Sequence, residues 1–196
     1  MPGHTSGVSG WEQKMTWSDI CDFEKATALL AQQKVWWEPG TASGYHSLNM
    51  GHLVGAVVQR VTGKSLKQFV AEEIAGPLGA DFQIGAKQQD WSRISNVIPP
   101  PPIQPAPGVR VSRDSVMYKT FANPPVDARV AHTPLWRNAD IGAANGHGNA
   151  RSVARMLSPI SLGVCTPIST LISPVWSSCF RMTWTQFLYK WQLTTD

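Results

Sequence analysis

The chain has 196 residues, of which 42% are apolar and only 15% are charged, and its formal net charge is +4. A chain of this length can bury the core of one full domain. The lysines and arginines are scattered and form no basic run, which argues against nucleic-acid binding. No stretch of about 18 apolar residues is present, so the sequence predicts no membrane-spanning helix.

The three cysteines are widely separated and form no C-x-x-C pair; they are Cys21, Cys165 and Cys179. This spacing argues against a disulfide framework or a zinc site and favours a reducing compartment. The first residues show no charged region followed by an apolar run, so we expect no signal peptide and a cytoplasmic location.

Apolar residues recur at helical spacing from Thr16 onward, and Ser18 or Asp22 could provide the N-terminal cap. Residues 47–62 carry the clearest helical pattern, which Gly63 ends as a C-terminal cap. The apolar stripe of this segment predicts the most buried helix of the chain. The residues expected to face the core are Leu53, Val54, Val57, Val58 and Val61.

Other local sequence patterns predict the remaining helices and loops. Gly51 and Gly55 lie four residues apart, so that face of the helix would let another backbone approach closely. Residues 65–68 fit a capping box, S-x-x-Q, and predict a second helix to about Ala75. The prolines between 99 and 107 predict an extended surface connection, and Asn149 could cap a last helix. Residues 164–196 have no clean period, and we expect them to be poorly ordered.

The most informative segment runs from Pro39 to Gly51 and reads as a turn, an exposed tyrosine and a helix start. Three further segments accompany it in a fixed order. The four are HTSG at 4–7, WEPGT at 37–41 with GYHS at 44–47, GKSL at 63–66 with GPLG at 76–79, and NGHGNARS at 145–152. Together they resemble the serine β-lactamase-related and penicillin-binding-protein-like family. The similarity is greatest to its esterase subgroup, the class C β-lactamase-like family VIII carboxylesterases, and covers about residues 4–163.

This resemblance implies an α+β fold of the β-lactamase/transpeptidase type, of which these residues form mostly the helical part, with little regular sheet. It implies a serine hydrolase acting on a small-molecule ester or amide without a cofactor. By position Tyr45 corresponds to the family's tyrosine base, whose pKa must be lowered by a nearby cation. Ser47 stands where many relatives have asparagine, which bears on lactam recognition more than on ester recognition.

The family's other two motifs are absent from the sequence, which contains neither S-x-x-K nor K-T-G. The nearest spacing is Ser152-Val153-Ala154-Arg155, and arginine stays protonated and cannot act as a base. We therefore expect a domain truncated at both ends, with a partial domain over 1–163 and a divergent tail over 164–196. We expect it to be incomplete as a catalyst.

Two alternatives stay open beside an incomplete hydrolase. The chain could be a non-catalytic remnant, a binding or interaction module of the same fold, or it could be an active hydrolase with an unrecognised nucleophile. Ser6, near His4, is better explained as a turn serine, because the family uses this loop structurally. His46, His52 and His147 are far apart in sequence, so we expect no metal site, and His147 is expected to shape a loop.

Overall fold

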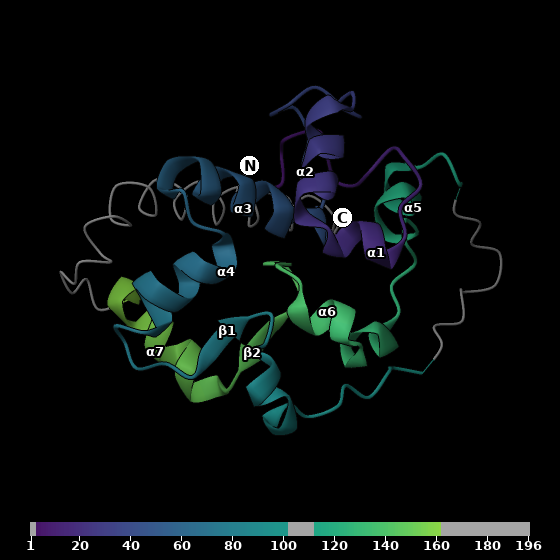
Figure 1. Ribbon diagram of the computed structural model, residues 1–196. Helices are drawn as coiled ribbons and strands as arrows, with labels where there is room; N and C mark the ends of the chain where they lie inside the picture. Colours follow the sequence, from purple (N-terminus) through teal and green to yellow (C-terminus); the bar gives the residue numbers. More distant parts are fainter. Residues whose placement is uncertain (1–2, 102–111, 162–196) are drawn as a thin grey trace, which may run out of the picture.

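The structure is a computed structural model that describes residues 3–101 and 112–161 (Figure 1). Within these residues helices predominate, and the regular sheet is a single antiparallel pair, β1 (Phe82–Ile84) and β2 (Gly146–Gly148), with Gln83 opposite His147. The expectation of a mostly helical structure with little sheet is confirmed. Among the described helices, none has the length and apolar character that a bilayer span requires.

The first two helices, α1 (Trp17–Cys21) and α2 (Phe23–Gln32), are separated by a single residue, Asp22. The Asp22 carboxylate accepts a hydrogen bond from the amide of Lys25 at 3.1 Å, so its predicted role as an N-cap is confirmed. The prediction of Ser18 as an alternative N-cap is wrong, because Ser18 lies inside α1. Thr16 caps that helix instead, in a capping box with Asp19.

Helix α3 (Asn49–Thr62) ends at Gly63, which has φ +72°, as predicted. The face that it buries differs from the expected one. Its buried residues are Asn49, Gly51, His52 and Gly55, whereas Val57 is 44% exposed and Val61 is 77% exposed. Leu53, Val54 and Val58 are half-buried. The prediction that this stripe faces the core is therefore wrong for Val57 and Val61, whereas Leu53 does pack against the core.

Close backbone packing explains why the glycine face of α3 is the buried one. A Cβ built on Gly51 would lie 2.3 Å from the backbone nitrogen of Ala143 and 2.8 Å from that of Gly142. A Cβ on Gly55 would lie 2.9 Å from the ring of Phe23. The expected close approach of another backbone is thus confirmed at Gly51, whereas Gly55 admits the side chain of Phe23. The contact at Gly51 takes precedence over the apolar stripe because any side chain there would separate the two backbones.

Helix α4 (Leu66–Phe69) continues into a π-helical segment, η1 (Val70–Ala75), so the predicted helical region to Ala75 is confirmed in extent. The Ser65 hydroxyl caps α4 by accepting from the amide of Gln68 at 3.1 Å. The Gln68 side chain donates to Glu72 at 2.9 Å and does not complete a capping box. Helix α3 packs against both α2 and α4.

The remaining elements follow in chain order: η2 (Gln88–Arg93), α5 (Val116–Phe121), η3 (Ala128–His132), α6 (Pro134–Asn138) and α7 (Ala150–Ser161). Asn149 accepts a hydrogen bond from the amide of Ser152 at 2.9 Å, which confirms it as the cap of α7. The predicted tail at 164–196, its boundary after 163 and most of the proline-rich connection lie outside the described residues.

The core lies between α1, α2, α6 and the loop that precedes α1. The indole of Trp11 donates to the carbonyl of Ala26 at 2.9 Å, so this large side chain is buried with its polar atom paired. Asn145, also buried, donates to the carbonyls of Trp136 and Ala139 and closes the turn after α6. The buried apolar cluster is Trp11, Met15, Ile20, Ala26, Leu30, Trp136, Ala139 and Ile141.

The packing of α3 yields a direct test. Gly51→Ala should lower the free energy of unfolding by at least about 2 kcal/mol, because its Cβ meets backbone atoms that cannot rotate away. Val61→Ala, on the exposed face, should change it by less than about 0.5 kcal/mol. Urea unfolding of both variants measures the difference, and equal losses would contradict the assigned orientation of α3.

Candidate active site

The residues of the HTSG motif (4–7) run beside the segment that carries Tyr45, which we call the tyrosine loop (residues 36–47). The amide of Gly40 donates to the carbonyl of Thr5 at 2.8 Å, and the amide of Gly44 donates to the carbonyl of His4 at 3.0 Å. Two motifs about 40 residues apart in sequence therefore form one hydrogen-bonded unit.

Gly7 makes the close approach of the two segments possible. Its φ is +80°, and a Cβ at this position would lie 2.4 Å from the carbonyl oxygen of Trp37. Only glycine fits both conditions. The Gly7 carbonyl in turn accepts from the amide of Trp36 at 2.7 Å, which fixes the start of the tyrosine loop.

His46, which follows the tyrosine, is fully buried and hydrogen bonded through both ring nitrogens. Its Nδ1 lies 2.6 Å from the carbonyl oxygen of Gly44, and its Nε2 lies 2.6 Å from the hydroxyl oxygen of Ser6. A carbonyl oxygen can only accept, so Nδ1 carries the proton and Nε2 accepts from the Ser6 hydroxyl. Burial lowers the pKa of His46, and the hydrogen bond to Gly44 opposes this shift in part.

His4 contacts both Tyr45 and the residue after it. Its Nδ1 accepts a hydrogen bond from the backbone N–H of His46 at 3.2 Å, and its ring centroid lies 5.1 Å from that of Tyr45. Burial lowers the pKa of His4, so the ring is neutral near pH 7. Its φ of +57° is uncommon for a residue other than glycine.

Tyr45 itself is 63% exposed. Its ring has the His4 imidazole on one side and Phe121 of α5 nearby, with the Phe121 ring at 6.2 Å between centroids and 17° between planes. Within the described part of the chain, the Tyr45 hydroxyl makes no hydrogen bond. Tyr45 is therefore an exposed side chain on a backbone that is hydrogen bonded to the HTSG segment at Gly44 and His46.

Ser47 and Asn49 connect the tyrosine loop to α3. Ser47 is half-buried with φ +48°, a left-handed conformation that asparagine adopts more readily than most residues. Asn49 is fully buried, and its side chain donates to the carbonyl of Val8 at 2.9 Å, just beyond the HTSG motif. Ser47 thus forms the turn between Tyr45 and the helix.

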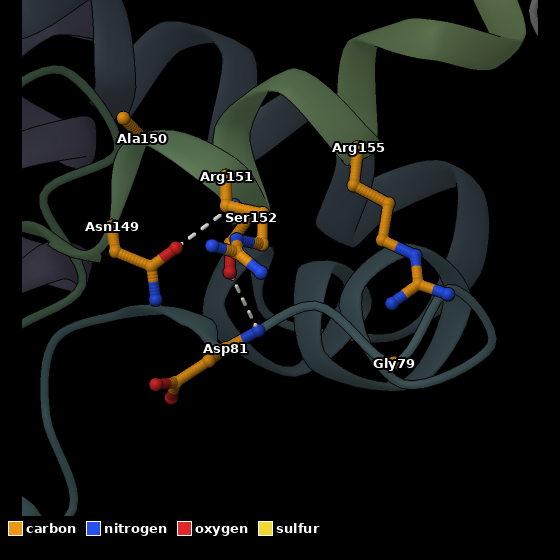
Figure 2. A pocket seen from close by; sticks show the side chains of 7 residues that line it. All are labelled: Gly79, Asp81, Asn149, Ala150, Arg151, Ser152 and Arg155. Atoms are coloured by element: carbon orange, nitrogen blue, oxygen red, sulfur yellow. Dashed lines mark hydrogen bonds between the residues drawn. The ribbon is translucent and has the colours of Figure 1, made fainter.

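The serine with the nearest S-x-x-K spacing lies in a different part of the molecule. A pocket of about 590 Å³ lies at the start of α7. Figure 2 shows Ser152 and Arg155 among the residues that line it. Ser152 is 5% exposed, and its hydroxyl accepts from the amide of Asp81 at 3.0 Å. Ser152 therefore joins α7 to the segment before β1, and Tyr45 does not line this pocket.

The other histidines have structural roles. His52 is fully buried against the rings of Phe23 and Trp11, and its Nε2 lies 2.9 Å from the carbonyl oxygen of Ile20. His147 was expected to shape a loop, but it pairs with Gln83 in the small sheet. No group of three or more metal-ligating side chains occurs within residues 3–101 and 112–161.

Tyr45 and Ser47 stay predicted site residues, and the sequence does not indicate which side chains surround Tyr45. The structure brings His4, Ser6 and His46 together at the tyrosine loop, and α5 adds Phe121. Three of the matched motifs contain a histidine, namely HTSG, GYHS and NGHGNARS, so the sequence alone does not indicate which of them meet.

Comparisons with known proteins identify the family of the chain. Residues 3–171 match the Beta-lactamase family, and the chain belongs to it. It is 30% identical over 171 residues to the Esterase/beta-lactamase LipL of Mycobacterium tuberculosis, which covers 82% of this chain and 39% of that protein.

Solved structures show the same relationship. A family VIII carboxylesterase is 36% identical with a TM-score of 0.72, over 82% of this chain and 42% of that one. A penicillin-binding protein homologue from Caulobacter crescentus is 27% identical with a TM-score of 0.66, over 82% and 42%. The predicted β-lactamase/transpeptidase-like fold is therefore confirmed. The chain spans about two fifths of the length of the relatives it matches.

The buried histidines predict how stability depends on pH. Burial lowers the pKa of His4, His46 and His52, so the unfolded chain takes up protons first as the pH falls below about 6.5. The free energy of unfolding should be fully present above that pH. It should then fall toward pH ~5, by up to about 1.4 kcal/mol per pH unit for each of the fully buried His46 and His52, and by less for the partly exposed His4.

Urea unfolding across this pH range measures the slope. His52→Gln should be less stable at neutral pH but should show a shallower slope, because its amide can still donate to the Ile20 carbonyl without titrating. Stability that stays constant or rises as the pH falls from about 7 to about 5 would contradict the burial of these rings.

Proposed function

We propose that this chain is the tyrosine-bearing, mostly helical part of an esterase-like serine hydrolase whose substrates are small-molecule esters or amides. The observation that carries the proposal is Tyr45, an exposed phenol on a loop held rigidly by the HTSG motif. The similarity to a family VIII carboxylesterase supports the ester as substrate class.

The chemistry assigned to Tyr45 is proton transfer. A serine hydroxyl is a poor nucleophile until a base takes its proton, and a tyrosine can act as that base only when a cation lowers its pKa. The Tyr45 side chain is 63% exposed, which is consistent with a hydroxyl that meets such a pair of groups from outside the described residues.

We propose further that these 196 residues are incomplete as a catalyst. The sequence contains no S-x-x-K, so it offers no serine with a lysine one helical turn away. Ser152 does not fill this role, because it is buried, is hydrogen bonded to the backbone of Asp81 and has Arg155 in place of the lysine three residues later. A non-catalytic binding module is the second candidate, and it is favoured by the same free, exposed Tyr45 ring beside Phe121.

An activity assay tests the first claim. The purified chain should hydrolyse neither p-nitrophenyl acetate nor nitrocefin at an ordinary enzyme rate, on the order of 1–1,000 per second, because the covalent step lacks its nucleophile. If turnover does appear, Tyr45→Phe should reduce it strongly. The control is Tyr118→Phe, which changes a different exposed tyrosine, on α5, and should not reduce it.

Labelling with a fluorophosphonate probe and mapping the site by mass spectrometry separates the remaining hypotheses. We expect no stoichiometric label. Label on Ser6, which is hydrogen bonded to His46, would contradict the proposal and would identify an unrecognised nucleophile. Saturable shifts of the Tyr45 ring signals with 4-nitroacetanilide, without turnover, would favour the binding module.

A further inference from the structure

The strongest inference concerns His4, which the sequence resemblance treats only as part of a structural loop. We propose that His4 is a positioning residue for Tyr45, holding both the peptide that follows the tyrosine and one side of its ring. This inference rests on the proposed function in assigning a chemical role to Tyr45, but the positioning itself is tested independently of activity.

His4 makes two contacts with the tyrosine loop, one to the Tyr45 ring and one to the backbone of His46. The ring of His4 is 5.1 Å from the ring of Tyr45, while its Nδ1 accepts the backbone N–H of His46 at 3.2 Å. One side chain thus constrains the tyrosine ring and the backbone immediately after it. Phe121 constrains the ring from α5.

The His4 ring is neutral, with its proton on a known nitrogen. Because Nδ1 accepts a hydrogen bond, the single proton of the neutral imidazole lies on Nε2. Burial lowers the pKa of His4 and keeps this neutral form near pH 7. A neutral ring supplies no cation to Tyr45, so its effect is positional and not electrostatic.

The backbone of His4 has an uncommon conformation. Its φ of +57° is a conformation that is unfavourable for a residue with a side chain. Its carbonyl accepts from the amide of Gly44 at 3.0 Å, so the strained residue is bonded through both its backbone and its side chain to the tyrosine loop. Among the described residues, the titratable rings that contact the His4 ring are those of His46 and Tyr45.

Protonation of the His4 ring makes its positioning role measurable. A proton on Nδ1 of His4 would face the N–H of His46, and two donors cannot bond. In the unmodified chain, NMR should therefore show the Tyr45 ring signals and the His46 amide shifting together, with the same pH midpoint as the His4 ring itself. If the NMR signals of the Tyr45 ring do not shift as His4 titrates, the proposal is wrong.

Two variants separate the two contacts. Asparagine tolerates a positive φ and places an acceptor near the position of Nδ1, so His4→Asn should keep the His46 amide protected but move the Tyr45 ring signals toward those of a mobile tyrosine. His4→Phe keeps a ring but removes the acceptor, so exchange of the His46 amide should rise at least about tenfold. Identical spectra for Tyr45 in His4→Asn and in the unmodified chain would overturn the assignment.

His132→Asn is the matched control, since this exposed histidine lies on η3 and contacts the backbone of Val97. It should leave the Tyr45 signals unchanged at every pH. If His132→Asn changes them as His4→Asn does, the effect is general and the proposal fails. Ester turnover by the chain would contradict the proposed incompleteness without affecting this result, so the two failures are distinguishable.

Discussion

The hydrogen-bonded pairing of the HTSG segment with the tyrosine loop is the constraint on which the site depends. Backbone hydrogen bonds join the two segments at Thr5 and His4, and they come this close because Gly7 has no side chain. The ring of His46 fills the space between them, with one proton arrangement that satisfies Gly44 and Ser6 together. Tyr45 is therefore exposed at its ring but fixed at its backbone, a combination that suits a group required to meet a substrate in one orientation.

The helix that follows the loop is positioned by a second close approach. Gly51, six residues after Tyr45, packs directly on the backbone at Gly142 and Ala143. Together with buried Asn49, which binds the Val8 carbonyl, this contact fixes the start of α3 relative to the HTSG motif. Stability and site geometry thus rest on the same few residues, so a substitution at Gly51 would disturb the tyrosine loop as well as the core.

Much of this fold could be predicted from the sequence where a local rule decided the outcome. The cap at Asp22, the stop at Gly63, the cap at Asn149 and the tyrosine before α3 all follow from short-range chemistry. The orientation of α3 could not, because periodicity detects an apolar stripe but not how closely another backbone approaches. Val57 and Val61 were assigned to the core for that reason, and they are exposed. The supports of Tyr45 were missed because His4 and His46 lie 42 positions apart and meet only through tertiary structure.

Amide hydrogen exchange across the tyrosine loop tests most directly whether the HTSG segment holds it. The amides of Gly40, Gly44 and His46 donate to Thr5 and His4, whereas those of Ala42 and Ser43 donate to no acceptor in the described part of the chain. The account predicts that the first three exchange at least about 100-fold more slowly than the other two, relative to their unstructured rates, because each must wait for the pairing to open. Equal and rapid exchange at all five amides would show that the loop is not held, and would contradict the assignment of Tyr45 to a preformed site.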